Sequence, residues 1–196
     1  MIGSFPSAYL LVKTKHKADI TREGSGNVGT YNAIVVSKSK ATGAAVLLID
    51  LLKGAVTVYI MLFVLGISYQ TALIGSVFLI LGHNYPVWLK FKGGRGLAIG
   101  AGIFMIVNYY VLIGWCVIWL VLKLSKTDIL IANTFATFSI LISVFLINRY
   151  AWLAISHNIR SFSLSYFTLF SVVITIIVLI SHLEVFKNLV NKKSNS

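Results

Sequence analysis

A run of small and hydrogen-bonding residues, REGSGNVGTYNA at positions 22–33, interrupts a chain that is otherwise strongly apolar. Its glycines free the backbone to adopt positive φ and to turn successive N–H groups toward one point. Its other small residues supply side-chain hydrogen-bond donors. The glycines are Gly24, Gly26 and Gly29, and the donors are Ser25, Asn27, Thr30 and Asn32. A concavity of this kind suits an anion such as a phosphate, although flexible connections between helices have the same composition.

A second glycine-rich run, GHNYPVWLKFKGGRG at positions 82–96, places two glycines between two cations. The cations are Lys92 and Arg95, the glycines are Gly93 and Gly94, and a helix is expected to begin at Gly96. Cations beside a helix N-terminus suit a phosphate or an acyl-phosphate headgroup. The spacing excludes a Walker A loop, which needs a Lys-Ser/Thr pair. The alternative is that the two cations only anchor the chain at an anionic membrane surface.

Three ionisable residues lie within or at the end of apolar runs. Asp50 and Lys53 in LLIDLLKG are three residues apart and therefore share one face of a helix. Charges in such a run are costly unless they are paired, so we expect these two to face each other or the bundle interior. They serve either as an ion pair that fixes packing or as substrate contacts. His83 is either a general base or a hydrogen-bonded structural group.

The sequence offers no pattern for a metal or a cofactor. Its five acidic residues are spread along the chain, and the four histidines and single cysteine form no cluster with metal-ligand spacing. No Ser-His-Asp arrangement is apparent either. We therefore expect neither a metal nor a cofactor.

Composition assigns the chain to the membrane. It has 196 residues, of which 58% are hydrophobic and 11% charged, and its mean hydropathy is +0.89. A soluble domain contains far more charge than this, so we expect one integral membrane domain over residues 1–196. The net charge of +12 does not indicate nucleic-acid binding, because the basic residues are scattered over short connections between apolar runs. Attraction to anionic membrane lipids accounts for them better.

The apolar runs predict an all-α fold, a polytopic bundle of seven transmembrane helices with glycine-rich connections. The first run is about a dozen residues, too short to span a hydrocarbon core of roughly 30 Å, so the first helix is expected to be short. The polar and aromatic NYY at 108–110 separates the fourth run from the fifth. The runs lie at about residues 2–13, 43–66, 68–89, 96–110, 111–124, 129–147 and 164–181.

Lysine and arginine positions predict the orientation. Basic residues are concentrated in the odd-numbered connections and in the C-terminal tail, whereas the second and fourth connections have none. The positive-inside rule then places both glycine-rich loops and the C-terminus in the cytoplasm and the N-terminus outside. The sixth connection, 148–162, breaks the pattern with Arg149 and Arg160. Its Trp152 and alternating apolar residues suggest an interfacial helix on the outer surface.

Four segments resemble the PlsY family of bacterial membrane acyltransferases, in the family's order, within residues 3–105. They are GSFPSAYLL at 3–11, GSGNVGTYN at 24–32, LLIDLLKG at 47–54 and GHNYPVWLKFKGGRG at 82–96. The resemblance implies a seven-helix protein of the bacterial inner membrane. It also implies a reaction without a cofactor, in which an acyl chain passes from acyl phosphate to glycerol 3-phosphate. The partners implied are these two substrates and membrane lipids.

The resemblance also implies roles for individual residues. Ser25, Gly26 and Asn27 would line a phosphate pocket supported by Asn32, and the run from Lys92 to Arg95 would hold the phosphate of donor or acceptor. His182 or the substrate's own phosphate would take the acceptor proton. The remaining implied residues are Lys126 as a phosphate contact, and Asp50, Lys53, His83 and Glu184 as supporting groups.

Three positions depart from the family pattern. Val35 stands where an arginine usually follows the asparagine of the first loop, and Val185 stands where an asparagine usually follows the closing glutamate. In the fifth connection Lys126 keeps the charge of the usual arginine but not its bidentate fork. Two alternatives to the family reaction therefore stay open: an enzyme that uses another acceptor, and a non-catalytic bundle that binds lipid phosphate.

Overall fold

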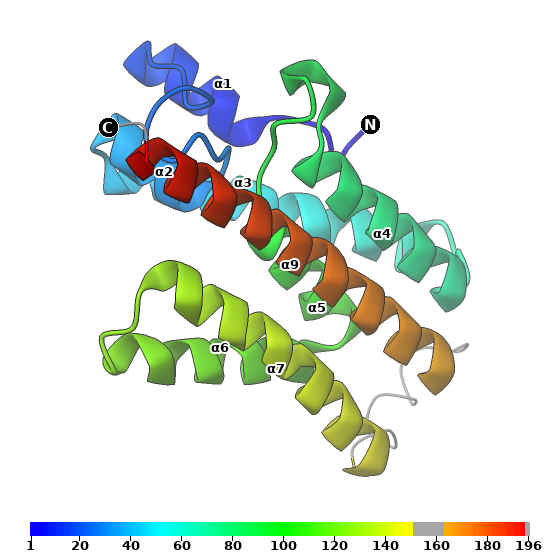
Figure 1. The fold of residues 1–196 in the computed structure, drawn as a ribbon. Helices are drawn as coiled ribbons and strands as arrows, with labels where there is room; N and C mark the ends of the chain where they lie inside the picture. Colours follow the sequence, from blue (N-terminus) through cyan, green and yellow to red (C-terminus); the bar gives the residue numbers. More distant parts are fainter. Residues whose placement is uncertain (151–162, 195–196) are drawn as a thin grey trace.

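The computed structural model describes residues 1–150 and 163–194, and every regular element in them is helical (Figure 1). The predicted all-α fold is therefore confirmed. The α-helices are α1 Ser7–His16, α2 Thr30–Ser37, α3 Lys40–Tyr59, α4 Tyr69–Asn84, α5 Leu97–Val107, α6 Tyr109–Leu124, α7 Ile129–Tyr150 and α9 Leu164–Ser194. A π-helical turn, η1 Ile60–Val64, continues α3, and a 3-10 turn, η2 Val87–Leu89, follows α4.

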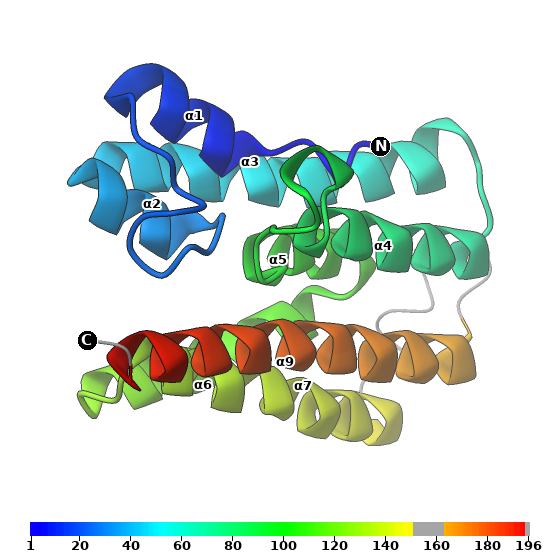
Figure 2. The ribbon, with the colours of Figure 1, turned by 45° about the horizontal axis from the view of Figure 1, so that its top comes forward.

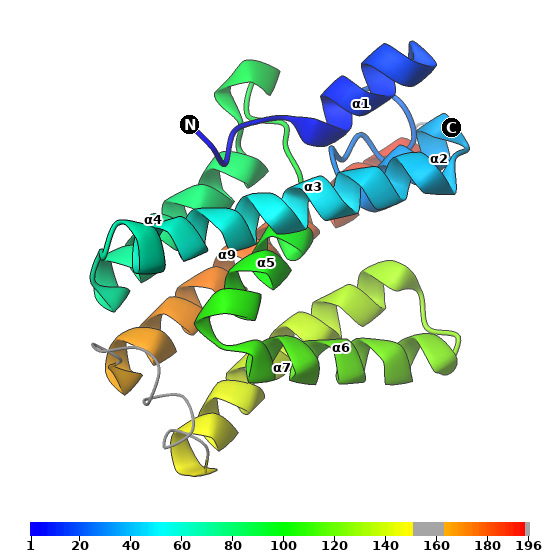
Figure 3. The same ribbon diagram turned by 180° about the vertical axis from the view of Figure 1, so that it is seen from behind.

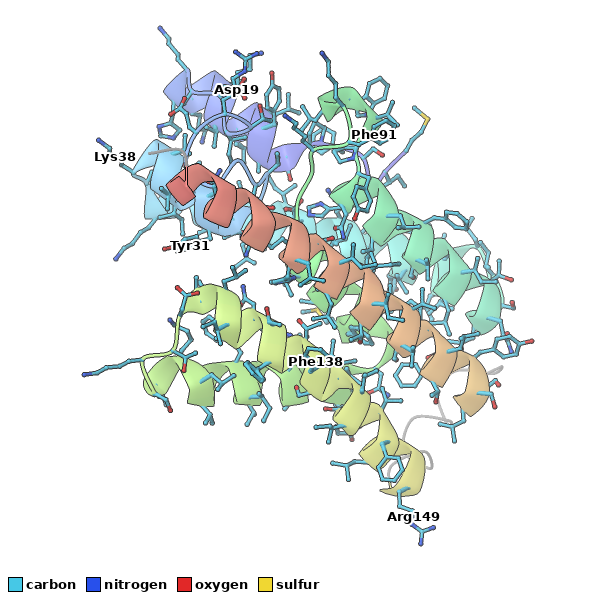
Figure 4. All side chains as sticks on the ribbon, viewed as in Figure 1. Asp19, Tyr31, Lys38, Phe91, Phe138 and Arg149 are labelled. Atoms are coloured by element: carbon cyan, nitrogen blue, oxygen red, sulfur yellow. The ribbon has the colours of Figure 1, made fainter. Side chains whose placement is uncertain are left out.

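Four segments in the described residues are long and apolar enough to cross a membrane. They are Lys40–Val64, Tyr69–Leu89, Ile129–Leu146 and Leu164–Leu183, whereas α5 and α6 are apolar but shorter. Large apolar side chains on these helices face outward, as Phe138 does on α7 (Figure 4). An apolar outer surface of this kind is stable against lipid hydrocarbon but not against water.

The helices form two groups joined by α9. In Figures 2 and 3, α1 to α5 lie on one side and the α6–α7 hairpin on the other. α9 packs against α4 in the first group and against α7 in the second. A cluster of buried apolar residues that includes Tyr69, Ile103 and Phe167 fills the junction. α9 therefore connects the two halves through the main core.

Close packing of α3 on α5 positions the charged residues of α3. A Cβ on Gly54 would meet the carbonyl oxygen of Ile99, and one on Gly102 would meet that of Leu51. The two backbones are therefore in direct contact, as small residues allow at helix interfaces in membranes. Asp50, one turn before Gly54, lines the same groove as Leu97 at the start of α5.

Local structure differs from the sequence prediction in the first connection. Residues 30–37 form α2, which was expected to be part of a loop, because burial of Asn32 and Ala33 compensates for its short length. The first helix begins at Ser7, later than predicted. The predicted break between the fourth and fifth runs is confirmed, since Asn108 adopts an extended conformation and its Oδ1 accepts from the Tyr110 N–H. The interfacial helix expected in the sixth connection falls largely on residues 151–162, outside the described part.

Candidate functional site

Asn32 organises the loop between α1 and α2. Its Nδ2 donates to the carbonyl oxygens of Ile20 and Glu23, both at 3.1 Å, and its Oδ1 accepts from the Ser25 N–H at 3.0 Å. Asn32 is buried, and its amide is used within the loop. Asn32 therefore holds the loop in its concave shape, and Ser25 and its neighbours line the concavity.

Only some of the glycines predicted to adopt positive φ do so. Gly24 and Gly26 have φ of 61° and 74°, whereas Gly29 is extended with φ of −144°, so the expectation for Gly29 is wrong. Gly29 precedes the first turn of α2, where an extended residue normally stands. The two left-handed glycines are what turn the chain at Ser25.

The second loop, residues 85–96, packs against the first. The Gly93 carbonyl accepts from the Val28 N–H at 3.1 Å, and the Gly94 N–H donates to the His83 carbonyl at 3.2 Å. A Cβ on Gly94 would meet the His83 ring. These glycines are thus required by close packing, while the left-handed residues of the loop are Lys90 and Phe91 before them and Gly96 after them.

The two loops enclose a polar pocket of about 250 Å³. Its cation is Lys92, which is exposed. One residue from the end of α4 and one from α9 complete the wall. The lining residues are Thr21, Ser25, Gly26, Asn27, Asn84, Phe91, Lys92, Gly93, Gly94 and Ser181. Backbone N–H groups, hydroxyls and an ammonium group around a hollow of this size suit a phosphate.

An apolar groove of about 500 Å³ begins beside the polar pocket. Asn27 lines both, and Arg95 follows the pocket residue Gly94 directly in the chain. From this polar end the groove is lined mainly by residues of α3, α5 and α6. Its walls include Leu47, Leu51, Leu97, Ala101, Leu112, Trp115 and Trp119. A molecule with an anionic head and a long apolar chain would match both cavities at once.

A buried polar cluster supports the second loop from behind. The Asp50 carboxylate accepts from the Ser7 hydroxyl at 2.6 Å and pairs with the Lys53 ammonium at 3.1 Å. Lys53 also donates to the Phe5 carbonyl at 3.1 Å and reaches the His83 Nδ1 at 3.3 Å. The predicted Asp50–Lys53 pair is therefore present, and His83 belongs to the same network. Because the ammonium only donates, His83 Nδ1 is the acceptor and its proton lies on Nε2.

Arg95 and His182 each carry a buried nitrogen without a partner in the described part of the chain, Nε in Arg95 and Nε2 in His182. Burial lowers the pKa of the Arg95 guanidinium, and the Asp128 carboxylate opposes that effect. The His182 Nδ1 lies 2.8 Å from the Val178 carbonyl, so in the neutral ring Nδ1 donates and Nε2 is an acceptor. Arg95 lines the apolar groove, whereas His182 lines neither cavity and follows the pocket residue Ser181 in the chain.

The other predicted residues are placed less centrally. Lys126 is exposed in the α6–α7 turn and lines neither cavity. Val35 is 47% exposed on α2. Glu184 and Val185 belong to α9, and their side chains lie outside the described part. Sequence reasoning missed Asn84 and Ser181, which only the packing of α9 against α4 brings together.

Comparison with known proteins identifies the family. The model of the family described as glycerol-3-phosphate acyltransferase matches residues 1–192. The chain belongs to this family. The resemblance found in four sequence segments is thereby confirmed and extends to α9.

Relatives of this family align over different shares of the chain. A glycerol-3-phosphate acyltransferase of Pelagibacter ubique is 31% identical over 98% of this chain and 91% of its own length. One of Gluconobacter oxydans is 40% identical over 64% of this chain, and that match spans 60% of the Gluconobacter protein. The crystal structure of PlsY (YgiH), an integral membrane glycerol 3-phosphate acyltransferase, in its glycerol 3-phosphate form matches with a TM-score of 0.80. It is 27% identical, covering 97% of this chain and 88% of that one. Membership of an integral membrane family agrees with the apolar outer surface.

Proposed function

We propose that this chain transfers an acyl group from an acyl phosphate to glycerol 3-phosphate, forming 1-acyl-glycerol 3-phosphate and phosphate. The observation that carries the proposal is the meeting of a polar pocket with an apolar groove at the Gly94–Arg95 step. The phosphate groups of both substrates suit the pocket, and the acyl chain suits the groove. The names of the relatives support glycerol 3-phosphate as the acceptor.

The proposed chemistry is direct acyl transfer. The primary hydroxyl oxygen of glycerol 3-phosphate attacks the acyl carbonyl carbon, a new ester C–O bond forms, and the bond from that carbon to the phosphate oxygen breaks. Phosphate leaves with the bonding electrons. Because phosphate is a good leaving group, orientation and nearby cations suffice, and no covalent intermediate is needed. Lys92 and Arg95 supply those cations, and Ser25, Gly26, Asn27, Gly93 and Gly94 orient the phosphate groups.

His182 is our candidate for the proton acceptor. Its Nδ1 is committed to the Val178 carbonyl, so a lone pair is left on Nε2. A general base must present such a lone pair toward the hydroxyl that reacts. In this proposal the primary hydroxyl of glycerol 3-phosphate gives its proton to that nitrogen as the ester forms.

We further propose a topology of seven crossings in the bacterial inner membrane, made by α1, α3, α4, α5, α6, α7 and α9 of one domain. The N-terminus would lie outside, and the C-terminus and the two loops of the site would lie in the cytoplasm. The exposed lysines at the end of α1 and after α2, among them Lys38 (Figure 4), support this orientation. Phosphate, the water-soluble product, would then be released on the cytoplasmic side.

A second candidate is the same transfer to a different acceptor. Val35 offers no polar contact where the family usually has an arginine, and its half-exposed side chain lies on α2, the helix that follows the first loop. Loss of that cation would weaken the hold on an acceptor phosphate. This alternative predicts acyl-phosphate breakdown with some acceptor other than glycerol 3-phosphate, whereas a non-catalytic lipid-phosphate binder would show no breakdown with any.

The deciding experiment measures phosphate release from palmitoyl phosphate by the purified protein in detergent, with and without glycerol 3-phosphate. We expect release that needs the acceptor and that falls roughly 100- to 1,000-fold in the Arg95→Ala variant, the range for losing one transition-state donor. Lys90→Ala is the matched control, because Lys90 is exposed and lines neither cavity. No release by the unmodified protein with glycerol 3-phosphate would overturn the proposal.

A further inference from the structure

Hydrogen bonds between α4 and α9 fix the orientation of the Asn84 side chain. The Ser181 hydroxyl donates to the Ile177 carbonyl at 3.0 Å, which uses its single proton. Asn84 Nδ2 lies 2.7 Å from the same hydroxyl oxygen. Because that oxygen has only acceptor capacity left, the Asn84 NH₂ group must be the donor. The carbonyl oxygen of the Asn84 amide is therefore turned away from Ser181.

This orientation leaves a buried acceptor at the polar pocket. Asn84 is 3% exposed and lines the pocket together with Ser181. Within the described residues its Oδ1 has no hydrogen-bond partner. A buried carbonyl oxygen without a donor is destabilising, so a residue kept in this state indicates a donor that arrives with the ligand. Phosphate oxygens are acceptors and do not satisfy it, whereas a hydroxyl does.

We propose that Asn84 Oδ1 accepts a hydrogen bond from the secondary hydroxyl of glycerol 3-phosphate, the hydroxyl that does not react. This inference rests on the proposed function. An amide oxygen accepts a hydrogen bond without taking a proton, which suits a hydroxyl that stays intact. The His182 Nε2, on the residue after Ser181, suits the hydroxyl that loses its proton. Asn84 and Ser181 thus select an acceptor with two neighbouring hydroxyls over a simple alkanol phosphate.

The test pairs a variant with a modified acceptor. Acyl transfer from palmitoyl phosphate is measured with glycerol 3-phosphate and with 3-hydroxypropyl phosphate, which lacks the secondary hydroxyl. We expect the unmodified protein to lose roughly 10- to 100-fold in kcat/KM on the modified acceptor. We expect Asn84→Ala to lower kcat/KM for glycerol 3-phosphate by a similar factor. With the modified acceptor, its kcat/KM should stay close to that of the unmodified protein. Its KM for palmitoyl phosphate should not change.

An equal loss with both acceptors in Asn84→Ala would overturn the inference, because a merely structural role reduces both alike. Ser181→Ala gives a second reading: the amide is freed to rotate, so part of the preference for glycerol 3-phosphate should disappear. Ser76→Ala is the matched control, since Ser76 is a buried α4 hydroxyl that donates to the Ala72 carbonyl away from the pocket. If the unmodified protein transfers no acyl group to glycerol 3-phosphate, both the proposed function and this inference are wrong.

Discussion

At the scale of single residues, the site is supported by charges that have been removed from solvent. The Lys53 and Asp50 side chains are 6% and 2% exposed. Such a pair is costly to bury and is stable only when each partner has further hydrogen bonds. Asp50 finds one in Ser7, and Lys53 finds them in Phe5 and His83. The cluster therefore ties the start of the chain and α3 to the α4 end that carries the second loop.

Removing one member of this pair should destabilise the protein strongly. Lys53→Met leaves the Asp50 carboxylate buried without its cation, and we expect a loss of about 3–5 kcal/mol in the free energy of unfolding. The measurement is thermal unfolding in detergent. The double variant Asp50→Asn, Lys53→Met should recover a large part of the loss, because no uncompensated charge remains.

Lys126→Met is the control for this experiment, since Lys126 is exposed and its removal should change stability by no more than about 0.5 kcal/mol. Equal melting temperatures for Lys53→Met and Lys126→Met would show that the buried pair contributes nothing to folding.

At the scale of elements, the α3–α5 contact sets the geometry between Asp50 and the start of α5. We expect Gly102→Ala to force the two helices apart and to lower both the melting temperature and acyl transfer, because its Cβ would overlap the Leu51 carbonyl. Overpacking of this kind costs about 1–3 kcal/mol. The readouts are thermal unfolding and kcat/KM.

Gly100→Ala is a matched control on the same helix. A Cβ there would lie 3.9 Å from the Ile80 side chain, an ordinary contact. Alanine also favours the helical conformation by about 1 kcal/mol over glycine, so this variant should be as stable as the parent or more so. If Gly102→Ala behaved like Gly100→Ala, the close backbone contact would not be needed.

Elements with a strong apolar pattern could be predicted from the sequence, and those held by tertiary contacts could not. The break at Asn108 and the pairing of Asp50 with Lys53 follow from local pattern and helical spacing. α2 was not predicted, because a helix of eight residues has a weak sequence signal. It is stabilised by the burial of Asn32, which the sequence does not show. Asn84 was not predicted as a site residue, because its proposed role depends on a hydrogen bond to Ser181, nearly a hundred residues later. Lys92 and Arg95 could be proposed as phosphate contacts from the sequence, because two cations flank two glycines there.

At the scale of the whole molecule, charge distribution predicts how the bundle is oriented. Cys116 is the single cysteine, so a Cys116→Ser background allows one reporter thiol at a time. We expect Lys40→Cys, at the start of α3, to react with a membrane-impermeant maleimide only in inverted vesicles. Ser68→Cys, before α4, should react in intact cells.

The reverse labelling pattern would contradict the proposed orientation and would place the site outside the cell. Labelling of both positions from the same side would instead show that the segment Lys40–Val64 does not cross the membrane.

The site draws its residues from almost the full length of the chain, and this matters for how the protein is made. Ser7 belongs to the first helix, while Ser181 and His182 belong to the last one described. During synthesis at the ribosome both glycine-rich loops emerge long before α9 does. A nascent chain therefore has both loops of the polar pocket but neither its proposed proton acceptor nor the serine that orients Asn84. In the proposed reaction, the site would therefore be complete for its acyl donor only once α9 has been made and inserted.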